Sequence, residues 1–106
     1  MLKEKTVQEL KLMMDSGEDY QLIDVRESYE YEICNLKGEL IPMGEVLSNL
    51  SRISRNKPVI IQCRSGARSG RICQLLEAEY GYTNLFNLKG GILAWADEID
   101  TNLSKY

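Results

Sequence analysis

Short apolar runs alternate with segments of helical spacing along this chain. After a capping box at residues 6–9, apolar side chains recur at Val7, Leu10 and Met14 until Gly17, which predicts an amphipathic helix. Short runs rich in apolar and β-branched residues predict four strands, at residues 20–25, 40–42, 58–63 and 84–88.

Helical spacing predicts a single turn at residues 28–32 and helices at residues 43–50, 67–80 and from about residue 91 onward. The side chains expected on the buried face of the helix at 67–80 are Ile72, Leu75, Leu76, Glu79 and Tyr80. Strands that alternate with helices favour an α/β domain with a mainly parallel central sheet flanked by helices on both faces. In such sheets, ligands bind at the carboxyl ends of the strands.

These elements fit one domain spanning residues 1–106, because a chain of this length with 43% apolar residues builds a single core. The net charge is −3 and the Lys and Arg residues are spread along the chain, so nucleic acid is not an expected partner. No run approaches the roughly 20 apolar residues that cross a bilayer, and the first residues lack the apolar stretch of a secretory signal. We therefore expect a cytoplasmic protein without membrane contact.

The absence of histidine narrows the chemistry more than any other feature of the composition. Without an imidazole the chain cannot build a Cys-His or Ser-His-Asp couple, so a nucleophile must be activated by backbone amides, Arg or Lys. Cys34, Cys63 and Cys73 form no C-x-x-C pair, which fits neither a disulfide framework nor a metal site. Gly66 and Gly70 lack the Lys-Ser/Thr ending of a phosphate-binding loop, so no nucleotide cofactor is expected.

Cys63 is the candidate nucleophile. It stands between a predicted strand and a predicted helix, where the unpaired N–H groups of a helix N-terminus converge and favour an anion. Arg64, Arg68 and Arg71 add positive charge and Gly66 permits a tight turn, so we expect a thiolate ringed by N–H donors beneath an open loop rim. The alternative, a buried structural thiol, fits poorly with arginines and a glycine directly after an apolar strand.

The segment from Cys63 to Ser69, Cys-Arg-Ser-Gly-Ala-Arg-Ser, resembles the active-site loop of rhodanese-like domains. Residues 22–27, 38–42 and 88–95 resemble the other core motifs of that family, so the resemblance covers nearly the whole chain. It implies the rhodanese-like fold and a sulfurtransferase that forms a persulfide on Cys63. The donor, thiosulfate or a protein persulfide, would be bound by Arg64, Ser65, Gly66, Ala67, Arg68 and Ser69.

Loop length distinguishes this chemistry from that of phosphatases. Cysteine-dependent phosphatases require Cys-x5-Arg, a loop wide enough for a phosphate group. Here the sixth residue after Cys63 is Ser69, and Arg68 comes one place too early. The shorter loop suits a single sulfur atom.

Four residues outside the loop have proposed roles. Asp24 and Arg26 follow a neighbouring predicted strand, where we expect Asp24 to pair with a loop arginine, and the resemblance implies that both support the site. Cys34 is either a resolving thiol for Cys63 or a residue without a chemical role. Cys73 is expected to fill space in a helix, and no metal is expected at any of these residues.

Residues 34–45 depart from the commoner family sequence and are similar to the rhodanese domain at the C-terminal end of E1-like adenylyltransferases. That similarity implies a ubiquitin-like sulfur carrier or an E1-like adenylyltransferase domain as partner, in molybdopterin or thiamine biosynthesis. The sulfur would then pass to cyanide or to the activated carboxylate of the carrier. A non-catalytic rhodanese-like docking or redox-sensing module, with the thiol unused, is the alternative.

Overall fold

Five strands form one parallel sheet in the order β1-β5-β4-β2-β3. In the computed structural model, which describes residues 2–106, the strands are β1 (Glu4–Lys5), β2 (Gln21–Asp24), β3 (Glu39–Leu40), β4 (Val59–Gln62) and β5 (Leu85–Leu88). Each pair of neighbouring strands described in this sheet is parallel. The α/β class and the parallel sheet predicted from the sequence are therefore confirmed.

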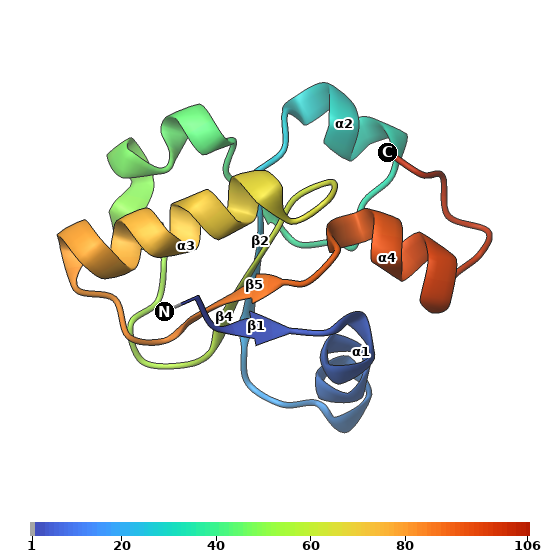
Figure 1. Ribbon diagram of the computed structural model, residues 1–106, viewed down its shortest axis with the longest axis horizontal. Coiled ribbons are helices and arrows are strands. Elements are labelled where there is room, and N and C mark those ends of the chain that lie inside the picture. The colour runs from blue at the N-terminus through green and yellow to red at the C-terminus, as the bar shows by residue number, and fades with distance from the viewer. Residues whose placement is uncertain (1) are drawn as a thin grey trace.

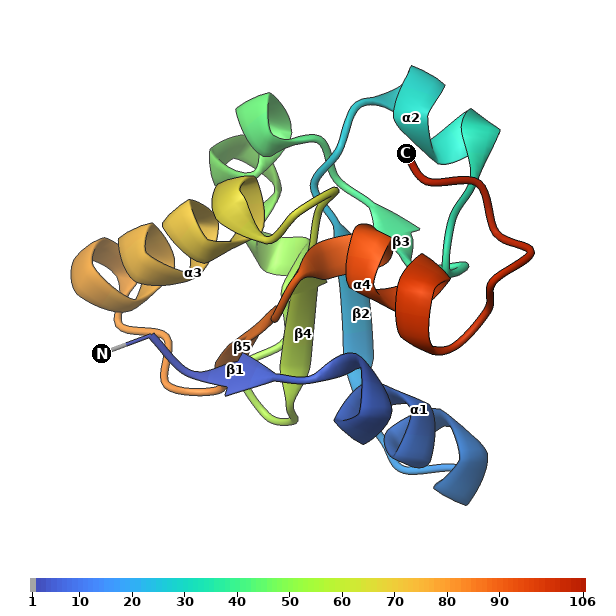
Figure 2. The same cartoon turned by 45° about the vertical axis from the view of Figure 1, so that its right-hand side comes forward.

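Helices cover both faces of the sheet, as predicted. They are α1 (Val7–Ser16), α2 (Ser28–Ile33), α3 (Ala67–Tyr80) and α4 (Gly91–Glu98), with 3-10 helices η1 (Met43–Glu45) and η2 (Leu47–Arg52). The helices α1 and α4 lie on one face and α3 on the other, while α2 lies beyond the carboxyl ends of the strands (Figures 1 and 2). Between residues 2 and 106, no helix is both long and apolar enough to span a membrane.

Each face of the sheet has its own apolar core, because successive side chains of a strand point to opposite faces. Ile61 of β4 belongs to the core on the α3 side, which also holds Ile72 of α3. Its neighbour Ile60 belongs to the core on the other side, with Leu10 of α1 and Trp95 of α4. All strand residues of β4 are buried, so the loop that follows β4 starts from a fixed point at the centre of the sheet.

Several local predictions are confirmed. The Glu9 amide donates to Thr6 Oγ1 at 3.1 Å and the Thr6 amide donates to Glu9 Oε1 at 2.8 Å, which completes the capping box that begins α1. Helix α3 has the predicted bounds and ends at Gly81, whose φ of 71° is the left-handed conformation that glycine tolerates. Ile92 and Trp95 are buried in the core.

The predicted helix at residues 43–50 is wrong, because two short 3-10 helices replace it. Asn49 interrupts the second of them, η2, with φ −128° and ψ 27°. The side chains of Ser48 and Asn49 both donate to the carbonyl of Glu45, at 3.0 and 2.7 Å, and so compete with helical backbone bonds. Strand β1 was not predicted, since two residues show no periodicity.

The buried face of α3 also differs in part from the prediction. Its buried residues are Ser69, Gly70, Ile72, Cys73 and Leu76. Leu75 and Tyr80, which the sequence placed on that face, are 36% and 39% exposed, and Glu79 is exposed as well. Two small residues therefore face the sheet in the first turn of α3, where the loop after β4 joins it.

Candidate active site

Cys63 directly follows β4, and the loop between β4 and α3 lies at the carboxyl end of the sheet (Figure 1). Only residues 64–66 separate Cys63 from the first residue of α3. Gly66 is the N-cap of α3, and its φ of 100° is a conformation that other residues adopt only with strain. This turn brings the first amides of α3 back towards the cysteine.

Two backbone amides and one hydroxyl group lie within hydrogen-bond distance of Cys63 Sγ. The amide nitrogen of Gly66 lies 3.1 Å from the sulfur, that of Ser69 lies 3.5 Å away, and Ser69 Oγ lies 3.3 Å away. The amides belong to the N-cap and to the first turn of α3, where N–H groups have no partner within the helix. Donors in this arrangement stabilise negative charge on sulfur without a proton-accepting side chain.

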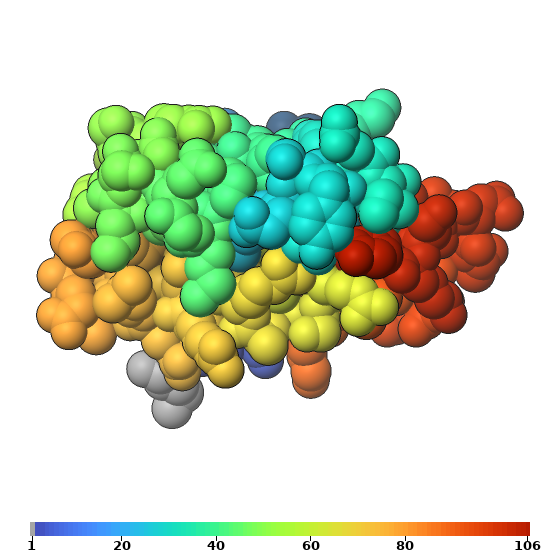
Figure 3. Space-filling view, turned by 90° about the horizontal axis from the view of Figure 1, so that it is seen from above, coloured from blue at the N-terminus to red at the C-terminus, as the bar shows by residue number. Residues whose placement is uncertain are grey.

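The thiol itself is closed off from solvent. Cys63 is 0% exposed, so the expected open rim above the sulfur is wrong: the loop backbone and the start of α3 pack around the sulfur. Arg64, Ser65 and Ala67 are exposed on the outer side of the loop. Seen from above, α2, the loop and the C-terminal residues close against one another (Figure 3). The ring centroid of Tyr106 lies 5.6 Å from Arg64 Cζ.

Arg68 forms a two-pronged ion pair with Glu30 of α2, which the sequence analysis missed. The Nη1–Oε1 and Nη2–Oε2 distances are 2.7 and 2.9 Å, and the Glu30 side chain is only 5% exposed. The hydrogen bond to Glu30 outweighs burial and raises the pKa of Arg68 above its ordinary value. The same bond lowers the pKa of Glu30. Glu30 thus balances much of the positive charge that we expected Arg68 to bring to the site.

The predicted pairing of Asp24 with a loop arginine is wrong, because Asp24 pairs with Arg26. Both side chains are fully buried, and Arg26 donates to the Asp24 carboxylate at 2.8–3.1 Å. Burial opposes the charge on Arg26, but the hydrogen bonds and charge of Asp24 outweigh it and raise the pKa of Arg26.

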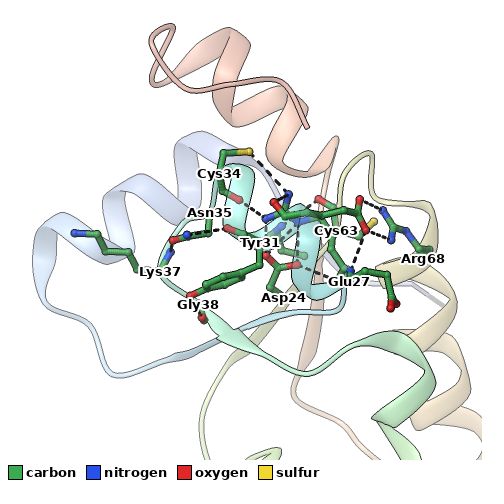
Figure 4. A network of polar contacts seen from close by, with 12 residues as sticks. Asp24, Glu27, Tyr31, Cys34, Asn35, Lys37, Gly38, Cys63 and Arg68 are labelled. Carbon is green, nitrogen blue, oxygen red and sulfur yellow. Dashed lines mark hydrogen bonds and ion pairs between the residues drawn. The ribbon is translucent and has the colours of Figure 1, made fainter.

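Arg26 connects this buried pair to α2. Its Nη2 donates to the carbonyl of Cys34 at 2.7 Å and its Nη1 to the carbonyl of Glu30 at 3.4 Å. Figure 4 shows Cys34 and Arg68 on opposite sides of the resulting network, with Asp24 between them. Asp24 and Arg26 therefore fix α2, and α2 in turn holds Arg68 through Glu30.

Replacing Glu30 with glutamine should lower the stability near neutral pH by about 1–3 kcal/mol, because Arg68 loses a charged partner. Since Arg68 lowers the pKa of Glu30, the pair stabilises the fold above the ordinary glutamate pKa of 4.5 and loses this effect as pH falls through the folded-state pKa. The unfolding temperature of the unmodified protein should therefore fall more steeply below that pH than that of Glu30→Gln. Glu32→Gln, on the exposed side of α2, is the control. Equal slopes for the protein and Glu30→Gln would contradict this role.

The loop is also held from β5 and α4. The Ile92 amide donates to the carbonyl of Cys63 at 3.0 Å, and the Leu93 amide to that of Arg64 at 3.1 Å. Asn87 of β5 donates to the carbonyl of Gly66 at 3.1 Å. Sequence analysis missed Asn87, although a polar residue inside an otherwise apolar strand was an available signal.

The other two cysteines lie apart from these donors. All three cysteines are free and buried. Cys34 Sγ lies 3.9 Å from Arg26 Nη1, at the end of α2. Cys73 lies in the core on the α3 side, which confirms its predicted packing role, and burial raises its pKa to about 12.

Comparison with known proteins shows to which family the chain is similar. The family described as Rhodanese-like domain matches residues 6–98. A sulfurtransferase of Allochromatium vinosum is 36% identical over 97 residues, which cover 91% of this chain and 90% of that protein. The crystal structure of a rhodanese-like domain protein from Staphylococcus aureus superposes with a TM-score of 0.81 at 32% identity, covering 92% of this chain and 95% of the other.

Some relatives are longer. The probable adenylyltransferase/sulfurtransferase MoeZ of Mycobacterium tuberculosis is 31% identical over 104 residues, which cover 95% of this chain. The chain spans only 26% of the length of that protein.

Proposed function

The chain belongs to the rhodanese-like domain family, and from this premise we propose that it is a sulfurtransferase that carries the transferred sulfur as a persulfide on Cys63. The family includes proteins named sulfurtransferases that this chain covers almost completely. One observation carries the proposal: two amides and one hydroxyl converge on a single sulfur at the end of the central strand. Such a site stabilises a sulfur anion at each stage of a transfer.

The proposed reaction begins with a displacement at sulfur. The Cys63 thiolate attacks the outer sulfur of thiosulfate or of a donor persulfide, the S–S bond of the donor breaks, and sulfite or the donor thiolate leaves with the electron pair. With cyanide as acceptor, the carbon of cyanide attacks the outer sulfur of the Cys63 persulfide, and the electron pair of the broken S–S bond returns to Cys63 as a thiolate. With an activated carboxylate, the outer sulfur instead attacks the carbonyl carbon and the activating group leaves with the electron pair of its C–O bond. An external dithiol then reduces the S–S bond of the acyl disulfide, which releases the thiocarboxylate and restores the Cys63 thiol. No proton-accepting side chain is required, in keeping with a chain that contains no histidine.

Donor access requires movement of the loop, because Cys63 is fully buried. The rim residues Arg64, Ser65 and Ala67 are exposed and connect to α3 through Gly66, a residue with wide backbone freedom. We assign donor binding to this rim. Arg64 supplies the charge that attracts an anionic donor, since Glu30 already balances Arg68.

The acceptor we propose is either cyanide or the activated carboxylate of a ubiquitin-like sulfur carrier, with an E1-like adenylyltransferase as the activating partner. The likeness to the longer adenylyltransferase/sulfurtransferase supports the carrier, and it concerns only the quarter of that protein that this chain matches. A cytoplasmic location and a role in molybdopterin or thiamine biosynthesis belong to the same proposal.

Whole-protein mass measurement tests the persulfide. After incubation with thiosulfate, the protein should gain the mass of one sulfur atom, and cyanide should remove it. A peptide digest should place the added sulfur on Cys63, and the Cys63→Ala variant should gain nothing. A protein that gains no sulfur from thiosulfate or from a low-molecular-weight persulfide would overturn the proposal.

The complete burial of Cys63 favours one second candidate, a non-catalytic docking or redox-sensing module. In that case, the thiol would stay intact in the presence of either donor, while a partner protein bound through another face. The mass measurement separates the two functions directly. We favour the sulfurtransferase because a purely structural thiol does not need two amides and a hydroxyl group around its sulfur.

A further inference from the structure

We infer that Asn87 is a positioning residue for Cys63. Its Oδ1 accepts the hydrogen bond of the Ser69 hydroxyl while the sulfur is neutral, and the hydroxyl turns to donate to the sulfur when the sulfur becomes anionic. The inference deepens the proposed function, on which its catalytic meaning rests. It starts from hydrogen bonds beneath the loop. Ser69 Oγ lies 3.3 Å from Cys63 Sγ and 2.5 Å from Asn87 Oδ1.

The surroundings of Asn87 fix which way its amide points. Its Nδ2 lies 3.1 Å from the carbonyl oxygen of Gly66 and 3.2 Å from Glu4 Oε2. Both neighbours accept hydrogen bonds, so the NH₂ group must face them and the Oδ1 atom must face Ser69. Asn87 is only 3% exposed, which leaves little room for water to take over either role.

A hydroxyl group has a single proton, and this fact couples Asn87 to the sulfur. Oδ1 can only accept, so the contact with Asn87 requires Ser69 to donate to it. Ser69 then turns a lone pair towards Cys63, which suits a neutral S–H or a divalent persulfide sulfur and disfavours a thiolate. When Cys63 becomes anionic, the hydroxyl must rotate towards the sulfur and leave Oδ1 without its donor.

This arrangement has a use in the proposed reaction. While Cys63 carries the extra sulfur, Sγ is uncharged and the Ser69 hydroxyl keeps its hydrogen bond to Asn87 Oδ1. When an acceptor removes the outer sulfur, the electron pair of the broken S–S bond moves to Sγ, and the hydroxyl turns to stabilise the departing thiolate. No proton leaves Ser69, and only the direction of its hydrogen bond changes.

The glycines of the loop leave space for this amide. A Cβ added at Gly66 would lie 3.6 Å from Asn87 Nδ2, and one added at Gly70 would lie 3.4 Å from it. Asn87 therefore fills the space beneath the turn and the first turn of α3. Other charged or titratable groups act on the same region: Glu4 of β1 contacts Asn87, and Arg68 and Cys73 of α3 interact electrostatically with Cys63.

The test is a titration of the Cys63 thiolate by its ultraviolet absorbance in the full chain, corrected with the Cys63→Ala variant. Asn87→Ala should lower the pH midpoint of thiolate formation by about one unit, because the freed hydroxyl then donates to the anion. Asn87→Asp, which preserves the shape and adds a stronger acceptor, should raise the midpoint. In the Ser69→Ala background, Asn87→Ala should leave the midpoint unchanged.

Asn84→Ala is the matched control, because Asn84 is the asparagine just before β5 and its Nδ2 donates to the carbonyls of Ser54 and Lys57. It should lower the unfolding temperature without moving the midpoint. A merely structural role of Asn87 predicts the opposite sign, since a loosened loop would lose amide donors and raise the midpoint in Asn87→Ala.

A raised or unchanged midpoint in Asn87→Ala, or an unchanged midpoint in Asn87→Asp, would overturn the inference. So would a shift that persists without the Ser69 hydroxyl. The titration uses no sulfur donor, so its outcome stands apart from that of the persulfide measurement.

Discussion

Replacement of Cys63 by serine is expected to reduce sulfur transfer from thiosulfate to cyanide by about a thousandfold or more. The hydroxyl of serine has no activating base in a chain without histidine, so it cannot replace a thiolate that hydrogen-bond donors stabilise. Serine keeps the shape of the side chain and can accept the same hydrogen bonds from Gly66 and Ser69. The fold should therefore survive, and steady-state turnover is the measurement.

Cys73 provides the control for this substitution. It is also a fully buried cysteine, but its neighbours are apolar core residues and burial raises its pKa to about 12. Cys73→Ala should destabilise the protein by about 1 kcal/mol through a small cavity and leave turnover intact. Retained turnover in Cys63→Ser, or equal loss in both variants, would contradict the assignment of Cys63 as the nucleophile.

The fold could be predicted because its signals are local. The order of strands and helices, the capping box at Thr6 and Glu9, and the bounds of α3 each depend on a few consecutive residues. The order of strands across the sheet could not be predicted from the sequence, since it depends on contacts between distant segments. The prediction of one regular helix at residues 43–50 failed for a local reason that hydrophobic periodicity does not reveal. The Asn49 side chain donates to the carbonyl of Glu45 and so competes with the helical backbone bonds.

In the site, too, features within one short segment could be predicted, and contacts between distant segments could not. Cys63 and the loop glycine were visible in one short segment, whereas the partner of Arg68 lies 38 residues away in the chain. Likewise, nothing in the spacing of Asp24 shows that Arg26, two residues later, curls back to pair with it. Burial of the thiol depends on how α2, α3 and the loop pack together, so the sequence could not reveal it.

These contacts also determine where charge is available. The buried Asp24–Arg26 pair and the Glu30–Arg68 pair each balance a guanidinium with a carboxylate. The charge that stabilises a sulfur anion must then come mainly from the amides of α3 and from Arg64. Amides stabilise an anion only while the backbone keeps them directed at it. Two hydrogen bonds from the first turn of α4 hold the carbonyls of Cys63 and Arg64 in place.

Gly91 has the closest contact with the loop backbone. A Cβ at this position would lie 2.4 Å from the carbonyl oxygen of Arg64 and 2.6 Å from that of Cys63. Real Cβ atoms do not approach backbone so closely, and neither carbonyl can move freely. Both accept hydrogen bonds from the first turn of α4, from the Ile92 and Leu93 amides.

We therefore expect Gly91→Ala to destabilise the protein by about 3–5 kcal/mol, from a left-handed φ of 60° plus a clash with the loop backbone. Gly17→Ala separates these two causes, because Gly17 has a similar φ of 69° and nothing within 4 Å of the added Cβ. It should be destabilised by only about 1–2 kcal/mol and keep full turnover. Denaturant unfolding gives both values, and any folded Gly91→Ala should also transfer sulfur more slowly, since its loop carbonyls are displaced. Equal destabilisation of the two variants would show that backbone strain alone makes glycine necessary at position 91.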